Sequence, residues 1–183
     1  MLSHFKFCPK CGQPLPAPAA PIRLECAACG FVYYFNPAVS AAAIILNARG
    51  EALFIRRAKE PAKDKLALPG GFIDFNEIAE DALRREIREE VNLALGDVQY
   101  LCSYPNHYDY RGVTYTVLDL FFVARVDDPA PAAALDDVQS LSWLRPEKVP
   151  LAGLAFDSMR HALQTFLLPN LAAPVPAKGP PAP

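Results

Sequence analysis

The sequence lacks three features that would each indicate a different class of protein. No hydrophobic run approaches the length of a membrane-spanning helix, which argues against a helical membrane protein. The N-terminal residues, MLSHFKFCPKCG, contain no apolar stretch of the kind a secretory signal peptide needs, so we expect a cytoplasmic chain with reduced cysteines. The formal net charge is only −2, which gives no general attraction to nucleic acid or to an anionic membrane.

What the sequence contains is enough apolar material for one good core and a small extra module, since 52% of its 183 residues are hydrophobic. Four of its five cysteines form two C-x2-C pairs, CPKCG and CAACG: Cys8, Cys11, Cys26 and Cys29. Four thiolates at this spacing predict tetrahedral Zn²⁺, and Gly12 and Gly30 let the backbone turn tightly behind each pair. Because four cysteines leave no coordination position for water, the predicted zinc is structural; two disulfides are the alternative.

The cysteine pairs indicate a small zinc ribbon over residues 1–36. The segment between them is too rich in proline for a helix, and residues 31–35, FVYYF, are predicted to form a strand that packs over the metal site. The dipeptide Asn36-Pro37 marks its boundary. Zinc ribbons often bind nucleic acid or protein, and three cations here could contact phosphate or could simply be surface residues: Lys6, Lys10 and Arg23.

Residues 70–93, GGFIDFNEIAEDALRREIREEVNL, carry acidic residues where an ordinary amphipathic helix would not place them. Asn76 is the predicted N-cap of a helix over residues 78–91. Its apolar residues recur at helical spacing: Ile78, Ala79, Ala82, Leu83, Ile87 and Val91. At about 100° per residue, Glu86 and Glu90 fall within about 20° of Ala79, inside this apolar stripe. Glu89 lies at the edge of the stripe.

Carboxylates turned toward an apolar face need compensation, because the loss of their hydration is costly. Glu86, Glu89 and Glu90 occur at i, i+3 and i+4, so their side chains are expected to converge on one patch. They would then offer the hard oxygen ligands that Mg²⁺ or Mn²⁺ prefers. The alternative is a solvated helix with salt bridges along its surface.

The wider spacing resembles the signature of the Nudix hydrolases, G-x5-E-x7-R-E-U-x-E-E-x-G-U, in which U is an aliphatic residue. The matching positions are Gly71, Glu77, Arg85, Glu86, Ile87, Glu89, Glu90 and Leu93. Asn92 stands where the family usually has glycine, and asparagine also tolerates the left-handed conformation of a helix C-cap. The resemblance implies an α/β fold, an α/β/α sandwich around a mixed sheet over residues 37–169.

The resemblance also implies roles for the signature residues. The catalytic Mg²⁺ or Mn²⁺ would be held by Glu86, Glu89, Glu90 and the carbonyl of Gly70, while Glu77 and Arg85 pair and orient the metal-bearing carboxylates. The implied reaction is hydrolysis of the pyrophosphate linkage in a nucleoside diphosphate joined to another group. The general base stays open among four acids: Glu89, Asp119, Asp136 and Asp137.

Around the signature, apolar and alternating runs predict strands over residues 38–46, 52–56, 97–104, 113–126 and 141–144, and a helix over residues 156–168. A polar, aromatic loop is predicted at residues 105–112. Near it, Tyr104 and Tyr108 could stack on a base and Asn106 could hydrogen-bond its edge, although tyrosines are also routine at strand ends. A basic cluster could hold substrate phosphates or form a solvated loop: Arg56, Arg57, Lys59, Lys63 and Lys65. Residues 170–183, rich in proline and alanine, are predicted to be disordered.

A zinc ribbon followed by a Nudix signature is similar to the NADH pyrophosphatase group. That group carries an S-Q-P-W motif where this chain has Ser103-Tyr104-Pro105-Asn106, and often a glutamate where this chain has Ser140. NADH, NAD⁺, ADP-ribose and nucleotide sugars are therefore all expected substrate types. The alternatives are nucleotide-capped RNA ends, or a ligand sensor or nucleic-acid-associated regulator without catalysis. Many relatives are dimers, so a second copy of the chain is also a predicted partner.

Overall fold

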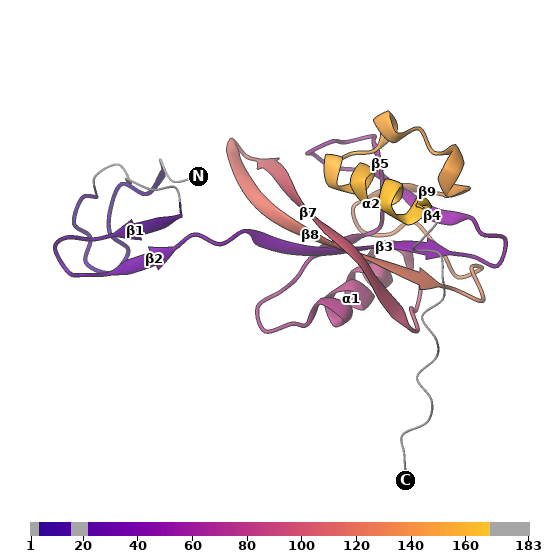
Figure 1. Cartoon of the computed structure of the whole chain (residues 1–183), viewed down its shortest axis with the longest axis horizontal. Helices are drawn as coiled ribbons and strands as arrows, with labels where there is room; N and C mark the ends of the chain where they lie inside the picture. The colour runs from indigo at the N-terminus through magenta and orange to yellow at the C-terminus, as the bar shows by residue number, and fades with distance from the viewer. Residues whose placement is uncertain (1–3, 16–21, 169–183) are drawn as a thin grey trace, which may run out of the picture.

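The computed structural model describes residues 4–15 and 22–168. The predicted disordered tail, residues 170–183, lies outside them. Figure 1 shows the chain passing from a small N-terminal sheet through a connecting segment into a larger sheet with helices on both sides. Within the described residues, the helices are too short or too polar to cross a membrane.

The N-terminal module is built on the two cysteine turns. Strands β1 (Arg23–Glu25) and β2 (Val32–Tyr34) pair antiparallel, which confirms a strand within residues 31–35. Gly12 and Gly30 have φ angles of 73° and 70°, in the left-handed region that the predicted turns require. The N–H of Gly12 donates to the carbonyl of Cys8 at 2.8 Å, and that of Gly30 to Cys26 at 2.9 Å. The two cysteine turns therefore have matching backbone geometry.

The larger sheet is mixed, as predicted. Its strands are β3 (Ala38–Leu46), β4 (Ala52–Arg57), β5 (Leu66–Ala67), β6 (Gly70–Phe72), β7 (Val98–Tyr110), β8 (Val113–Arg125) and β9 (Val138–Leu144). Strand β3 lies parallel to β8 and antiparallel to β4 and β6, while β7 and β9 pair antiparallel with β8 and β4. The order β5-β4-β3-β8-β7 leaves β7 at an edge.

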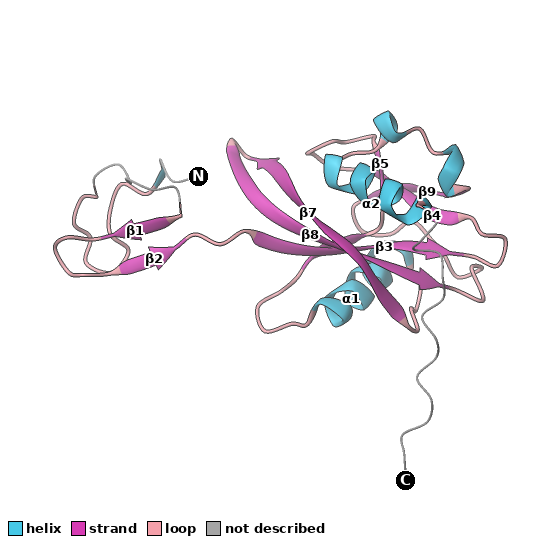
Figure 2. Ribbon diagram, in the orientation of Figure 1, coloured by secondary structure: helices cyan, strands magenta, loops and turns pink. Residues whose placement is uncertain are grey.

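Helices cover both faces of this sheet. Figure 2 shows α1 (Ala79–Val91) and α2 (Asp157–Leu167) on opposite sides of β3 and β8. The last six residues of β3, from Ala41 to Leu46, are all buried, as expected for a strand covered on both faces. Leu83, Ile87 and Val91 of α1 and Met159, Ala162 and Leu163 of α2 belong to the same core. The predicted α/β/α sandwich is confirmed. Two short 3-10 turns, Pro146–Lys148 and Leu151–Gly153, lead into α2.

The ends of α1 differ in how well the sequence predicts them. Asn76 is not the N-cap: that position is Ile78, without a side-chain cap, and Asn76 has a φ of 65° in the preceding turn. Asparagine suits this turn because it tolerates the left-handed backbone conformation, and the same residue type is also common at helix N-caps. At the other end, Asn92 is the predicted left-handed C-cap, with a φ of 56° and its N–H bonded to the carbonyl of Arg88.

The predicted loop at residues 105–112 is wrong. Strand β7 continues to Tyr110 and pairs with β8 as far as Tyr110 opposite Val113, so only Arg111 and Gly112 form the turn. Both turn residues have positive φ, 48° and 79°, as a tight hairpin requires. Pro105 does not end the strand, because an edge strand tolerates the missing N–H. The hairpin brings the aromatic residues of β7 onto the sheet.

Candidate active site

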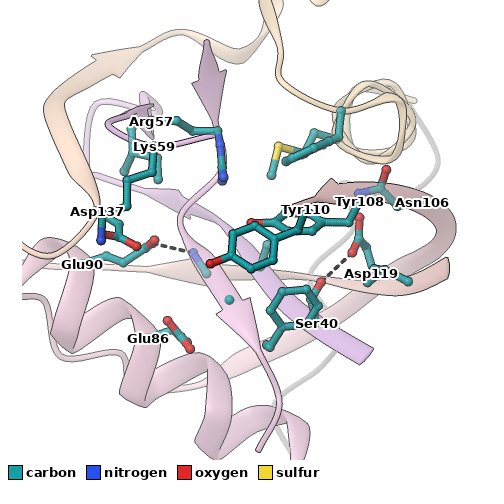
Figure 3. A pocket seen from close by; sticks show the side chains of 18 of the residues that line it. Ser40, Arg57, Lys59, Glu86, Glu90, Asn106, Tyr108, Tyr110, Asp119 and Asp137 are labelled. Atoms are coloured by element: carbon teal, nitrogen blue, oxygen red, sulfur yellow. Dashed lines mark hydrogen bonds and ion pairs between the residues drawn. The ribbon is translucent and has the colours of Figure 1, made fainter. Parts of the chain in front are cut away.

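One open cavity of about 500 Å³ gathers most of the predicted site. Residues of β3, β4, β6, β7, β8, α1 and α2 line it, with the connections after β4 and before β9 (Figure 3). Glu86 and Glu90 come from α1, and the aromatic residues come from β6, β7, β8 and the N-cap position of α2. The site therefore draws on five strands of the larger sheet and on residues from both helices.

Of the three glutamates expected to hold the metal, two line this cavity, Glu86 and Glu90. Burial raises the pKa of Glu90 to about 8, although the N–H of Gly70 donates to its Oε2 at 2.9 Å. Burial also raises the pKa of Glu86, against the opposing effect of the neighbouring Arg85. A buried carboxylate is costly to ionise, and a divalent cation removes that cost. Oxygen donors of this kind in one cavity fit Mg²⁺ or Mn²⁺.

The two glycines of β6 let this strand lie close to the backbone of Ala41 on β3 and to the carboxylate of Glu86. A Cβ atom on Gly71 would lie 2.4 Å from Cδ of Glu86. A Cβ atom on Gly70 would lie 2.2 Å from the carbonyl oxygen of Ala41, and Gly70 also has a φ of 139° that other residues rarely adopt. The strand β6 can therefore lie between β3 and the carboxylates only with glycine at both positions. The carbonyl of Gly70 as a metal ligand stays a prediction.

Arg85 holds the loop before α1 to the helix. Its Nε and Nη2 donate to the two oxygens of Glu77 at 3.0 and 2.9 Å, which lowers the pKa of Glu77. Its Nη1 donates to Oε1 of Glu86 at 2.8 Å, and Nη2 also donates to the carbonyl of Phe72 at 3.1 Å. One guanidinium thus joins the loop, β6 and a cavity-lining carboxylate, which is the arrangement expected for a residue that orients the site.

Glu89 lies apart from the other two. It is absent from the cavity lining, its side chain is 53% exposed, and one oxygen accepts from Nη1 of Arg85 at 3.3 Å. Among residues 4–15 and 22–168, the only group of three or more possible ligands whose donor atoms all lie within 4.8 Å is the four cysteines. The three glutamates do not form such a compact group. Glu89 as a metal ligand and as the base therefore stays a prediction.

Part of the basic cluster also reaches the cavity. Arg57 and Lys59 line it, whereas Arg56, Lys63 and Lys65 do not. The Arg57 guanidinium lies 5.3 Å from the ring centre of Phe156, and its Nε donates to the carbonyl of Pro61 at 2.8 Å. Lys59 forms an ion pair with Asp137, which also lines the cavity. Arg57 and Lys59 thus line the same cavity as the partly buried Glu86 and Glu90.

Two of the other acids considered as a base lie at the cavity. Asp137 and Glu90 are on one side of it in Figure 3, and Asp119 is on the other. Asp119 is 5% exposed, and its two oxygens accept from the hydroxyls of Ser40 and Ser158 at 2.6 and 2.5 Å. Asp136 does not line the cavity.

The predicted substrate residues divide in the same way. Asn106 and Tyr108 line the cavity, but Tyr104 does not, because its ring stacks on His161 of α2 with the centres 4.3 Å apart. Among the aromatic residues of the lining that sequence reasoning missed are Phe72 and Phe156. Their ring centres lie 5.5 and 6.0 Å from that of Tyr108. Phe72 follows the signature glycine directly, and this adjacency was a usable signal; nothing local marks Phe156.

The four predicted zinc ligands come together in the N-terminal module. The Sγ atoms of Cys8 and Cys29 are 3.7 Å apart, as are those of Cys11 and Cys26, and all four lie within 4.8 Å of one another. Four sulfurs about 2.3 Å from a central zinc would be roughly 3.8 Å apart, whereas a disulfide needs about 2.05 Å. The donor set fits tetrahedral zinc, and none of these cysteines is in a disulfide.

Comparison with known proteins agrees with this geometry. A family model described as NUDIX domain matches residues 36–166. The crystal structure of a MutT NUDIX hydrolase from Burkholderia pseudomallei is similar to the model with a TM-score of 0.61 and 28% identity, covering 72% of this chain and 98% of that one.

Curated proteins similar to the chain include two named NAD-capped RNA hydrolase NudC. The one from Stutzerimonas stutzeri (strain A1501) is 26% identical over 175 residues, which cover 96% of this chain and 60% of the relative. The one from Deinococcus radiodurans is 29% identical over 170 residues, covering 90% and 57%. The chain thus spans about three fifths of the length of these relatives.

Proposed function

The chain belongs to the Nudix family, and from this premise we propose that it is a Mg²⁺-dependent hydrolase of pyrophosphate bonds. Its substrates are nucleoside diphosphates joined to another group, of the NADH, NAD⁺, ADP-ribose or nucleotide-sugar type. One observation carries the proposal: a single cavity holds the partly buried carboxylates Glu86 and Glu90, the cations Arg57 and Lys59, and the aromatic ring of Tyr108. These groups match a metal-bound diphosphate with a flat ring attached.

Each group has a part in the proposed reaction. When bound by Glu86, Glu89, Glu90 and the Gly70 carbonyl, Mg²⁺ or Mn²⁺ supplies charge neutralisation and a more acidic water. Arg57 and Lys59 draw the phosphates into the cavity, and Arg85 with Glu77 keeps Glu86 in place. We propose Glu89 as the base, since it is more exposed than Glu86 and Glu90, with Asp137 beside Glu90 as the second candidate.

The N-terminal module, residues 1–36, is proposed to hold a structural zinc on Cys8, Cys11, Cys26 and Cys29, with residues 37–169 as the hydrolase domain. Pairing of two chains stays a prediction. A second substrate is favoured by the name of the relatives, NAD-capped RNA hydrolase. A dinucleotide at an RNA end presents the same diphosphate as the free molecule, so the same cavity would serve both.

The test is a substrate panel with Mg²⁺: NADH, NAD⁺, ADP-ribose, a dinucleotide, a nucleotide sugar and an NAD-capped RNA oligonucleotide. We expect turnover of at least one, abolished in Glu90→Gln and in Glu89→Gln. Glu80→Gln, the same change at an exposed position of α1, is the matched control and should retain activity. If no compound of the panel is hydrolysed but one binds with micromolar affinity, the enzyme proposal is wrong and the chain is a ligand sensor.

A further inference from the structure

Asp119 is an acid that the fold alone does not require. It lies on β8 between Val117 and Phe121, which point to the same side of the strand and line the same cavity. Both neighbours are buried and apolar. A third apolar residue would complete this wall without the cost of burying a carboxylate. Within the described residues, no lysine, arginine or histidine forms an ion pair with Asp119 that would offset that cost.

The hydrogen bonds of Asp119 hold it in place without using all its acceptors. Ser40 of β3 donates to Oδ1 at 2.6 Å, and Ser158 of α2 donates to Oδ2 at 2.5 Å. A carboxylate has about four acceptor positions, so about two remain. Because Asp119 lines the cavity, these are available to a ligand there.

A hydrogen-bond donor lies near this acceptor. Tyr104 is the partner of Asp119 across the β7–β8 pair, and Asn106 lies two residues further along the same face of β7. Such diagonal neighbours are roughly 7–8 Å apart, a separation that one ring system can bridge. The Oδ1 atom of Asn106 accepts from the N–H of His107 at 2.8 Å, which leaves its amide hydrogens for the cavity.

Flat rings stand beside this pair. The ring of Tyr108 is close to those of Phe72 and Phe156, with the centres 5.5 and 6.0 Å away, and all three residues line the cavity. Figure 3 shows Asp119, Asn106 and Ser40 on one side of the cavity and Glu86 and Glu90 on the other. A planar group could therefore occupy the aromatic side while a diphosphate reaches the glutamates.

We propose that Asp119 determines substrate specificity by accepting a hydrogen bond from the amino group of a planar ring, whose neighbouring acceptor meets Asn106. Two parts of a dinucleotide have this chemistry: the 6-amino edge of adenine and the carboxamide of nicotinamide. The inference rests on the proposed function, because it assumes that a dinucleotide-type substrate binds here. It assigns Asp119 to recognition of the substrate instead of proton transfer.

Two analogues of NAD⁺ distinguish the two rings. One carries nicotinic acid in place of nicotinamide, and the other carries hypoxanthine in place of adenine; each replaces an amino group by oxygen. An oxygen acceptor facing the Asp119 carboxylate is repelled, so the wild type should use one analogue at least about tenfold less well than NAD⁺ by kcat/KM. That analogue identifies the ring. In Asp119→Asn, the ratio of kcat/KM for NAD⁺ to kcat/KM for that analogue should fall to about threefold or less, mainly through a change in the KM values.

The control is Asp109→Asn, the same change at an exposed position of β7, which should keep the wild-type ratio. A wild type that uses both analogues within about threefold of NAD⁺ would overturn the inference whether or not Asp119→Asn folds. If the wild type hydrolyses none of the three, NAD⁺ is not a substrate, and the proposed function is judged separately by turnover of the other compounds of the panel. Calorimetry then measures the affinity of the wild type for the three compounds. Equal affinities, or no binding, would refute the proposed role of Asp119.

Discussion

The three glutamates of α1 that are expected to hold the metal differ strongly in burial: Glu86, Glu89 and Glu90. Burial raises the pKa of Glu90 to about 8 and also raises that of Glu86, whereas the side chain of Glu89 is 53% exposed. Helical geometry predicted this division, because Glu86 and Glu90 fall inside the apolar stripe and Glu89 at its edge. Helical geometry could not predict that Glu89 would pair with Arg85, because the same guanidinium also donates to three other groups: Glu77, Glu86 and the carbonyl of Phe72.

At the residue scale, Gly71→Ala should separate activity from stability. The new Cβ would lie 2.4 Å from Cδ of Glu86, so the carboxylate must move, while the backbone of Gly71 is not in the left-handed region. A displacement of this size should lower kcat/KM by roughly 100-fold. Kinetics on the best substrate of the panel and thermal unfolding of the same preparations measure the two effects.

Gly96→Ala is the matched control, because a Cβ there meets nothing within 4 Å and no positive φ is involved. Its activity should equal that of the wild type. Full activity in Gly71→Ala would mean that the position of Glu86 seen here is not the catalytic one.

At the scale of elements, prediction failed where local sequence signals pointed two ways. Pro105 and the polar residues after it are typical of a loop, yet β7 runs to Tyr110, because no strand among the described residues pairs with its outer edge and needs the missing N–H of Pro105. The pair Arg111-Gly112 was the signal for a two-residue turn, although arginine is unusual at a position with positive φ. The left-handed cap at Asn92 was predicted correctly, because glycine and asparagine share that conformation.

The end of α1 provides the prediction at this scale. Asn92 has a φ of 56°, and its Nδ2 donates to the carbonyl of Pro131 at 3.0 Å, which ties the helix end to the segment before β9. Asn92→Ala removes this hydrogen bond and places at the cap a residue that disfavours a positive φ, so it should destabilise the protein by about 1–2 kcal/mol in urea unfolding. Asn92→Gly loses only the hydrogen bond and should fall between alanine and the wild type. An alanine variant as stable as the wild type would contradict this account of the cap.

At the scale of the whole molecule, the catalytic signature could be predicted because it lies in one segment of the sequence. The surroundings of Asp119 could not, because they come from segments that are far apart in the sequence. Ser40 and Ser158 meet Asp119 across 79 and 39 residues of sequence. No pattern in any one segment indicates that contact. The cysteine pairs were predictable for the same reason as the signature: each pair is a short turn, and only their meeting depends on β1 and β2.

The two sheets of the molecule predict how zinc and catalysis are related. Among the described strands, β1 and β2 pair only with each other, and the cavity is lined entirely by residues from Ser40 onward. A small two-stranded sheet has little core of its own, so its folding should depend on the metal. The catalytic cavity should not depend on it.

We therefore expect about one zinc per chain in protein purified under reducing conditions, and its loss when Cys8 and Cys26 are both changed to serine. Hydrogen exchange in β1 and β2 should then accelerate, while Mg²⁺-dependent hydrolysis of a free dinucleotide stays within about twofold of the wild type. Cys102→Ser, at the cysteine outside the cluster, should keep the zinc. If activity on the free dinucleotide were lost together with zinc while α1 and α2 kept their exchange protection, the N-terminal module would have to take part in the active site itself.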